Sequence, residues 1–224
     1  MQDLINKIHN ADCLELMKEI PDKSIDLVLT DIPYNECNRN SNGLRNLNYD
    51  IADVFNLSMP NLLNELNRIC KGSFYIFCGT EQISEIRKTF INYGLSTRTI
   101  VWEKTNPSPM NGEFIWLSGI ELAFYGKNKK ATFNAHCKNT VLKHPVCQEY
   151  IIHPTQKPLS LFKEIINIST NENDLILDCF SGSGTTAIAC SELKRNFICI
   201  EKDKQYYEAS CKRLENYNKQ LKLF

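Results

Sequence analysis

Short apolar runs alternate with amphipathic stretches along most of this 224-residue chain, and this alternation limits the folds open to it. A run of about four to eight apolar residues is typical of a buried strand, whereas apolar residues three and four apart indicate one face of a helix. Strands that alternate with helices predict an α/β domain with a mostly parallel sheet and helices on both faces. Strands are predicted at 25–30, 73–78, 97–102, 121–125, 175–179 and 197–200, with a further short one at 7–10, and helices at 61–70, 81–92, 159–170, 185–193 and 204–219.

The composition is that of one globular domain, predicted to span residues 1–224. The hydrophobic content of 42% and the charged content of 23% are ordinary for such a domain. No apolar run approaches the roughly 18 residues that span a bilayer, and the N-terminus has no secretory pattern, so a cytoplasmic protein without membrane contact is expected. The ten cysteines form no Cys-x-x-Cys pair, which favours buried reduced thiols over disulfides or a zinc site, and no metal is predicted.

A glycine-rich turn follows the predicted strand at 175–179. Gly182 and Gly184 let the backbone approach a ligand closely, and the helix predicted from Thr185 directs its free N–H groups at the turn. A Gly-x-Gly pair alone does not decide between cofactors: Ala187 stands where a dinucleotide motif prefers a third glycine, although that motif sometimes tolerates alanine. Glu201 ends the next predicted strand and could accept hydrogen bonds from ribose hydroxyls, the alternative being a solvated turn acid.

A second motif, Asp31-Ile32-Pro33-Tyr34, ends the predicted strand at 25–30. It resembles the acid-Pro-Pro-Tyr motif of amino methyltransferases, and the segment 178–186, Asp-Cys-Phe-Ser-Gly-Ser-Gly-Thr-Thr, resembles their loop for S-adenosylmethionine (SAM). The catalytic motif comes first and the cofactor motif about 150 residues later. This order is similar to that of the permuted beta class of DNA N6-adenine and N4-cytosine methyltransferases, and the resemblance extends from about residue 12 to about residue 207.

The resemblance implies a Rossmann-like SAM-dependent methyltransferase fold with a seven-stranded sheet and a circularly permuted motif order. It also implies a set of cofactor-binding residues. The segment 153–158, His-Pro-Thr-Gln-Lys-Pro, is similar to the one that closes over the methionine part of SAM, and the segment at 12–13 to the one that contacts adenine. The cofactor set is Asp12, Cys13, Asp31, His153, Thr155, Lys157, Pro158, Asp178, Phe180, Ser181, Gly182, Ser183, Gly184, Thr185, Thr186, Glu201 and Lys202.

The same resemblance assigns the catalytic roles to residues 31–34. The Asp31 carboxylate and the backbone carbonyl of Ile32 would accept hydrogen bonds from the target amine, and Tyr34 would stack on a base extruded from the duplex. Ile32 departs from the motif, which has proline there, and so loses a fixed φ, while Pro33 still favours extended backbone before it. Aspartate at the first position favours adenine N6, because the cytosine N4 enzymes more often have serine.

The formal net charge is zero, so contact with double-stranded DNA must come from local clusters of charge. The family places target recognition between the last sheet strands and the cofactor helix, here a short insertion at about 127–152. Lysines there would neutralise phosphates, and arginines of the polar loop at 35–49 could close over a flipped base. The predicted DNA-binding residues are Arg39, Arg45, Lys127, Lys129, Lys130, Lys138 and Lys143.

Several alternatives remain open from the sequence. They are N4-cytosine methylation, modification of RNA or of a protein amide, a DNA-binding or cofactor-binding homologue that has lost activity, and a nicotinamide oxidoreductase. The motif order counts against RNA or protein-amide enzymes, and an oxidoreductase would leave residues 31–34 without a role. A short recognition segment is compatible with a homodimer, and a restriction endonuclease partner is compatible with the family, but no residue pattern specifies either. DNA binding would place the protein at the nucleoid.

Overall fold

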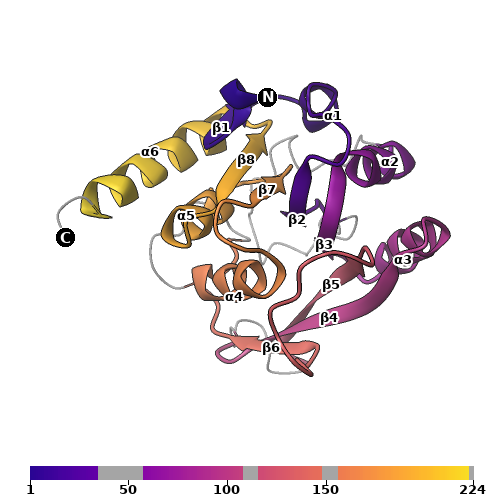
Figure 1. Cartoon of the computed structure of the whole chain (residues 1–224). Coiled ribbons are helices and arrows are strands. Elements are labelled where there is room, and N and C mark those ends of the chain that lie inside the picture. The colour runs from indigo at the N-terminus through magenta and orange to yellow at the C-terminus, as the bar shows by residue number, and fades with distance from the viewer. Residues whose placement is uncertain (35–57, 108–115, 148–155, 222–224) are drawn as a thin grey trace.

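The computed structural model describes residues 1–34, 58–107, 116–147 and 156–221. These residues form one eight-stranded sheet with helices on both faces (Figure 1). The strands are β1 (Lys7–Asn10), β2 (Ile25–Asp31), β3 (Cys70–Cys78), β4 (Ser96–Lys104), β5 (Ile120–Lys127), β6 (Val141–His144), β7 (Leu175–Asp178) and β8 (Asn196–Glu201). The helices are the short 3-10 turn η1 (Gln2–Leu4) and α1 (Cys13–Met17), α2 (Met59–Ile69), α3 (Ile83–Asn92), α4 (Leu159–Ser169), α5 (Thr185–Glu192) and α6 (Lys204–Leu221).

Strand direction decides which residues meet at the edge of the sheet. The order across the sheet is β1-β8-β7-β2-β3-β5-β4-β6. Every neighbouring pair is parallel except the two pairs that β5 makes, with β3 and with β4. The carboxyl ends of the seven parallel strands therefore lie at one edge, and the antiparallel β5 brings its first residues to that same edge.

Two apolar layers hold the helices against the sheet. Strand residues alternate between them: Val28 packs in the layer under α1, α2 and α3, and Leu29 packs in the layer under α4, α5 and α6. Figure 1 shows these two sets of helices on opposite sides of the sheet. Both side chains are fully buried, and each contributes roughly 1.5–3 kcal/mol through the apolar surface that it removes from water.

The fold class predicted from the sequence is confirmed, with two differences. The described residues form eight strands rather than seven, and the extra strand β6 lies inside the predicted insertion at 127–152, where no strand was predicted. Only Val141 and Leu142 of its four residues are apolar, a signal too short for pattern analysis. Helix α1 has five residues and was missed for the same reason.

Four cysteines that lie inside apolar runs, Cys78, Cys179, Cys190 and Cys199, are buried free thiols as predicted, whereas Cys137 is a free thiol that is exposed. Burial raises the pKa of the Cys78 thiol to about 12, so it is protonated and packs as a small apolar side chain. Within the described ranges, no helix has both the length and the apolar character of a membrane span.

Candidate active site

The two motifs recognised in the sequence lie on neighbouring strands. Strands β2 and β7 pair in parallel, so residues that follow their carboxyl ends lie side by side. Thr30 donates a hydrogen bond of 2.8 Å to Asp178 Oδ1, which joins positions 148 residues apart in the chain. The catalytic motif that begins at Asp31 and the glycine loop that begins after Asp178 therefore share one edge of the sheet.

A buried lysine connects the catalytic motif to the segment before α4. The Lys157 ammonium forms an ion pair with Asp31 Oδ2 and a second one, of 3.0 Å, with Glu121 Oε2. It also lies 5.6 Å from the ring centre of Tyr34. Lys157 is 5% exposed, and a buried ammonium needs such partners. The lysine predicted to line the cofactor thus directs its side chain at Asp31, the carboxylate predicted to be catalytic.

The charges of this cluster depend on one another. Burial raises the pKa of Asp31, and Glu121 adds to that effect, while Lys157 opposes it. Burial also works against the charge on Lys157, but Asp31 and Glu121 outweigh it and raise the pKa of the ammonium. Burial opposes ionisation of Glu121 too, yet Lys157 and Lys104 hold its pKa below the ordinary value. Burial and Glu121 therefore favour the protonated form of Asp31, whereas the two lysines favour the ionised form of Glu121.

One oxygen of Asp31 lacks a hydrogen-bond partner. Asp31 Oδ1 is buried and accepts no hydrogen bond from any group in the described part of the chain. A buried acceptor without a partner is costly and usually marks a site that another group completes. The carboxylate is therefore held at one oxygen by Lys157, while the other oxygen is buried without a hydrogen-bond partner among the described residues.

The backbone of the catalytic loop is fixed by contacts on either side of Ile32. The Ile32 N–H donates a 3.1 Å hydrogen bond to the Phe77 carbonyl, and its side chain, 1% exposed, packs in the α1–α3 layer. The Gln82 amide donates to the Pro33 carbonyl at 3.0 Å and accepts from the Gly79 N–H at 2.8 Å. Proline at position 32 would have no N–H to donate, so isoleucine replaces a fixed φ with an added strand hydrogen bond and an anchored side chain.

The glycine loop is closed by hydrogen bonds to two carboxylates. Asp178 accepts from the hydroxyls of Thr30 and Thr186 and from the Phe180 N–H. Glu201 accepts from the Gly182 N–H at 2.8 Å and, through its other oxygen, from the Asp203 N–H at 2.8 Å. These contacts position the loop that leads into α5.

Gly184 is the residue that permits the turn into α5. Its φ of +75° lies in the left-handed region, and a Cβ there would come within 3.1 Å of the Ser210 Cβ. A larger residue would meet both strain and a steric clash. The loop can therefore turn directly into the N-terminus of α5, where free N–H groups face the sheet edge.

A family model described as DNA methylase matches residues 25–212. The chain belongs to this DNA methylase family. Among curated proteins, it is 30% identical to the type II methyltransferase M.HinfI of Haemophilus influenzae, over 96% of this chain and 69% of that protein. It is 31% identical to the type II methyltransferase M2.MboI of Moraxella bovis, over 96% of this chain and 89% of that protein.

Solved structures agree with this assignment. The crystal structure of the M1.HpyAVI–SAM complex matches with a TM-score of 0.72 and 32% identity, covering 93% of this chain and 99% of that one. The cytosine-N4-specific PvuII DNA methyltransferase matches in fold, with a TM-score of 0.73, 19% identity and coverage of 95% and 91%. The protein is therefore a SAM-dependent DNA methyltransferase of the family that methylates N6 or N4 amino groups.

The residues at the sheet edge of this DNA methylase fit SAM. The Ser181 hydroxyl in the glycine loop is buried and has no hydrogen-bond partner among the described groups, as expected where a ligand completes the site. Three neighbouring parallel strands each bring a carboxylate to this edge: Glu201 is the last residue of β8, Asp178 is the last residue of β7, and Asp12 comes shortly after β1. SAM carries hydroxyls and a cationic sulfonium, which match acceptors and negative charge.

Several predicted cofactor residues of the methyltransferase also make contacts within the protein. Asp12 accepts a hydrogen bond from Leu14 N at the start of α1 and an ion pair of 3.1 Å from Lys202. The Cys13 side chain is buried in the α1–α3 layer, and Pro158 is the N-cap of α4. Phe180 packs partly against the same layer as Cys13. Predicted residues His153 and Thr155 lie outside the described residues.

The predicted DNA-binding lysines of the methyltransferase divide between two edges of the sheet. Lys127 ends the antiparallel β5 and therefore lies at the edge opposite to Asp31, with Lys129 and Lys130 directly after it. Lys143, in contrast, lies near the carboxyl end of β6, on the same edge as Asp31. The structure thus does not bring the five lysines together.

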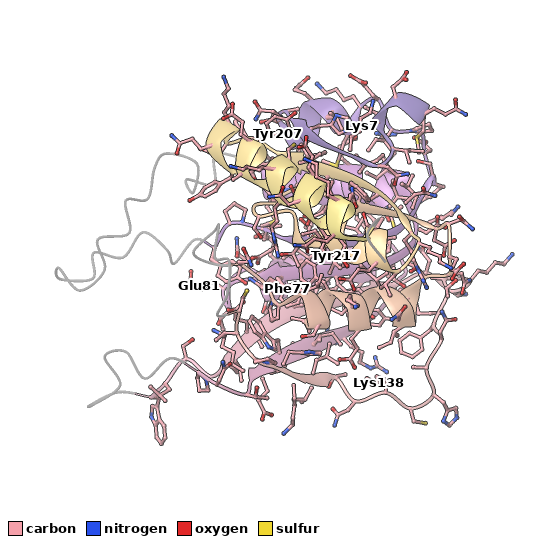
Figure 2. The ribbon with its side chains drawn as sticks, turned by 90° about the vertical axis from the view of Figure 1, so that its left-hand side faces the viewer. Lys7, Phe77, Glu81, Lys138, Tyr207 and Tyr217 are labelled. Carbon is pink, nitrogen blue, oxygen red and sulfur yellow. The ribbon has the colours of Figure 1, made fainter. Side chains whose placement is uncertain are left out.

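Two of these lysines take part in ion pairs. Lys143 pairs with Glu103 at 3.0 Å, and Lys138 pairs with Glu164 at 2.5 Å. Figure 2 shows Lys138 at the end of the molecule opposite to Lys7. The predicted residues Arg39 and Arg45 lie outside the described residues.

Sequence analysis missed three side chains that shape the site: Glu121, Gln82 and Arg213. Glu121 was predicted only as a strand residue, and no motif signalled it because its role depends on the reversal of β5. Gln82 was placed within a helix. The Arg213 guanidinium reaches from α6 to the Ser183 carbonyl at 2.9 Å and the Thr185 hydroxyl at 3.2 Å. The signal available for Arg213 was a charged residue on the inner face of an otherwise amphipathic helix.

Proposed function

We propose that this DNA methyltransferase methylates the exocyclic N6 of adenine in double-stranded DNA. The observation that carries the proposal is Asp31, a carboxylate held at Oδ2 by Lys157 and without a partner at Oδ1, beside the glycine loop. Aspartate at this position is also the residue that the resemblance associates with adenine rather than cytosine.

The residues of the chain supply orientation and hydrogen-bond acceptors. When bound, SAM supplies the methyl group: the amine lone pair forms the N–C bond, the C–S bond breaks with its electrons remaining on sulfur, and the amine then loses one proton. Asp31 Oδ1 accepts one N–H of the amine, and the Ile32 carbonyl accepts the other. Two acceptors draw the nitrogen toward tetrahedral geometry and free its lone pair from the ring. Asp31 is placed to take up the released proton, because burial raises its pKa.

Tyr34 provides the surface on which the flipped base stacks. Base stacking on an aromatic side chain is worth about 1–3 kcal/mol, which offsets much of the cost of extrusion from the duplex. Its hydroxyl donates to Glu121 at 3.4 Å, which restrains the ring. The segment 127–152 serves as the target-recognition insertion of this single domain, and Lys143, which lies at the same edge of the sheet as Asp31, contacts a phosphate.

The test is Asp31→Ala, assayed by mass spectrometry of nucleosides from DNA treated with enzyme and SAM. We expect N6-methyladenine from the wild-type protein and a loss of about a hundredfold or more in the variant, since a positioned catalytic hydrogen-bonding group is removed. Lys157 keeps Glu121 as a partner, so the variant should fold. The matched control is Asp22→Asn, an exposed aspartate paired with Arg68. Methylation at the wild-type rate in Asp31→Ala would exclude this site, and N4-methylcytosine as product would exclude adenine.

A further inference from the structure

Glu121 lies at the edge of the sheet that carries Asp31, here called the catalytic edge. No role has yet been assigned to its carboxylate. Glu121 is the second residue of β5, the one antiparallel strand among the described residues, and reaches this edge because of that reversal. Three groups contact it: Lys104 at 2.9 Å, Lys157 at 3.0 Å and the Tyr34 hydroxyl at 3.4 Å. A partly buried carboxylate with two ammonium partners and a phenol is firmly held.

The four charged groups form a chain of alternating sign. Lys104 on β4 pairs with Glu121, Glu121 pairs with Lys157, and Lys157 pairs with Asp31. The Lys157 ammonium therefore forms ion pairs with two carboxylates, and it neutralises the charge of Asp31 only in part. An acceptor whose charge is only partly compensated binds an amine N–H more strongly.

Other titratable groups face the same carboxylates. Asp31 is also near Tyr34, near Asp178 at the end of β7 and near Cys78 at the end of β3. Burial raises the pKa values of the Tyr34 phenol and the Cys78 thiol, so both are neutral near pH 7. Lys104 and Lys157 are therefore the cations of this cluster, and Asp31, Glu121 and Asp178 its acids.

We propose that Glu121 is a positioning residue for methyl transfer: anchored by Lys104, it shares Lys157 with Asp31, leaves Asp31 Oδ1 open to the target amine, and orients the Tyr34 ring through its hydroxyl. This inference rests on the proposed function, since it takes Asp31 as the acceptor of the amine. It adds a functional residue on β5, a strand that contains neither of the two recognised motifs.

The test compares the pH dependence of kcat in Glu121→Gln and Lys104→Met. Removal of the negative charge at 121 lowers the pKa of Asp31, so the acidic limb of the profile should move to lower pH, while kcat falls about tenfold because the acceptor is misplaced. Removal of the positive charge at 104 should move the limb to higher pH. Lys104→Arg should restore the wild-type profile. Glu65→Gln, which removes a carboxylate from an ion pair with Arg68 on α2, is the matched control.

A purely structural role for Glu121 predicts something different, namely loss of activity or of thermal stability without opposite shifts of the acidic limb. That result, or wild-type kcat and pH profile in Glu121→Gln, would overturn the proposal. An independent readout is the titration of Asp31 by carboxyl-carbon NMR, assigned with Asp31→Asn: its pKa should be lower in Glu121→Gln than in the wild type. If the wild-type protein yields no methylated DNA, the proposed function fails, and the NMR titration still decides whether Glu121 controls Asp31.

Discussion

Asp178 combines structural and electrostatic roles in one residue. It is 3% exposed, and its two oxygens accept hydrogen bonds from Thr30, Thr186 and the Phe180 N–H. Burial raises its pKa to about 6, although these hydrogen bonds oppose the shift. The folded protein therefore binds a proton at this residue over a pH range in which the unfolded chain has released it, so this group makes the fold less stable as pH rises from about 4 to about 6.

Replacement of Asp178 by asparagine should remove this pH dependence. A shift of about two pH units corresponds to about 3 kcal/mol of unfolding free energy, lost by the wild type across that range. Asn can accept from Thr30 and Phe180 with its oxygen and donate to the Thr186 hydroxyl with its amide. We expect urea unfolding of Asp178→Asn to be nearly flat between pH 4 and 6 relative to wild type. Asp178→Ala, which leaves the hydroxyls without a partner, should be destabilised at both pH values, and equal slopes in Asp178→Asn and wild type would contradict the assignment.

Helix α6 contacts the glycine loop from 30 residues further along the chain. It packs near β1, β8 and α5, and Figure 1 shows it along one side of the sheet. Arg213 carries the connection, because its guanidinium donates to the Ser183 carbonyl and to the hydroxyls of Ser183 and Thr185. A helix outside every recognised motif therefore stabilises the conformation of the glycine loop.

Arg213→Ala should weaken SAM binding without abolishing the fold. The hydrogen bonds lost involve a charged donor and are worth about 1.5–3 kcal/mol, so the Kd for SAM should rise about tenfold or more. Isothermal titration calorimetry would measure it directly. Lys212→Ala, the exposed neighbour on the same helix, is the control and should bind SAM as the wild type does. Unchanged affinity in Arg213→Ala would show that the loop holds its shape without α6.

The elements also show how far sequence reasoning extends. Helices of ten or more residues were predicted within two residues of their ends, and the long strands within three, because burial of an apolar face dominates their energetics. Strand β6 was missed because a four-residue edge strand depends on pairing with β4 rather than on its own pattern. The motif residues at 31–34 and 178–186 were found because their chemistry requires fixed residue types. Glu121, Gln82 and Arg213 were not, because only the three-dimensional arrangement gives them partners.

At the scale of the whole molecule, the reversed strand β5 separates two surfaces. Because β5 is antiparallel to its neighbours, Glu121 near its start lies at the catalytic edge and Lys127 at its end lies at the opposite edge. Lys143 on β6 stays at the catalytic edge. A protein with zero net charge binds DNA through such local placement of its cations, not through its total charge.

DNA binding should therefore depend on Lys143 more than on Lys129. We expect Lys143→Ala to weaken binding of duplex DNA and to reduce the slope of log K against log salt by about 1, as for a lost phosphate contact. Lys129→Ala, at the far edge, serves as the comparison and should change neither quantity measurably. Fluorescence anisotropy at several salt concentrations provides both numbers. An equal loss in the two variants would mean that the duplex also passes over the edge where β5 ends.

The isoleucine in the catalytic motif has a consequence for how the enzyme responds to heat. A proline ring keeps its shape whatever surrounds it, whereas Ile32 is held by the Phe77 carbonyl and by the side chains packed around it. Warming that loosens those neighbours also frees the backbone that presents the amine acceptors. Catalysis by this protein thus depends on how rigidly its interior is packed, and activity should be lost at a lower temperature than the fold. In a relative with proline at this position, the two temperatures should lie closer together.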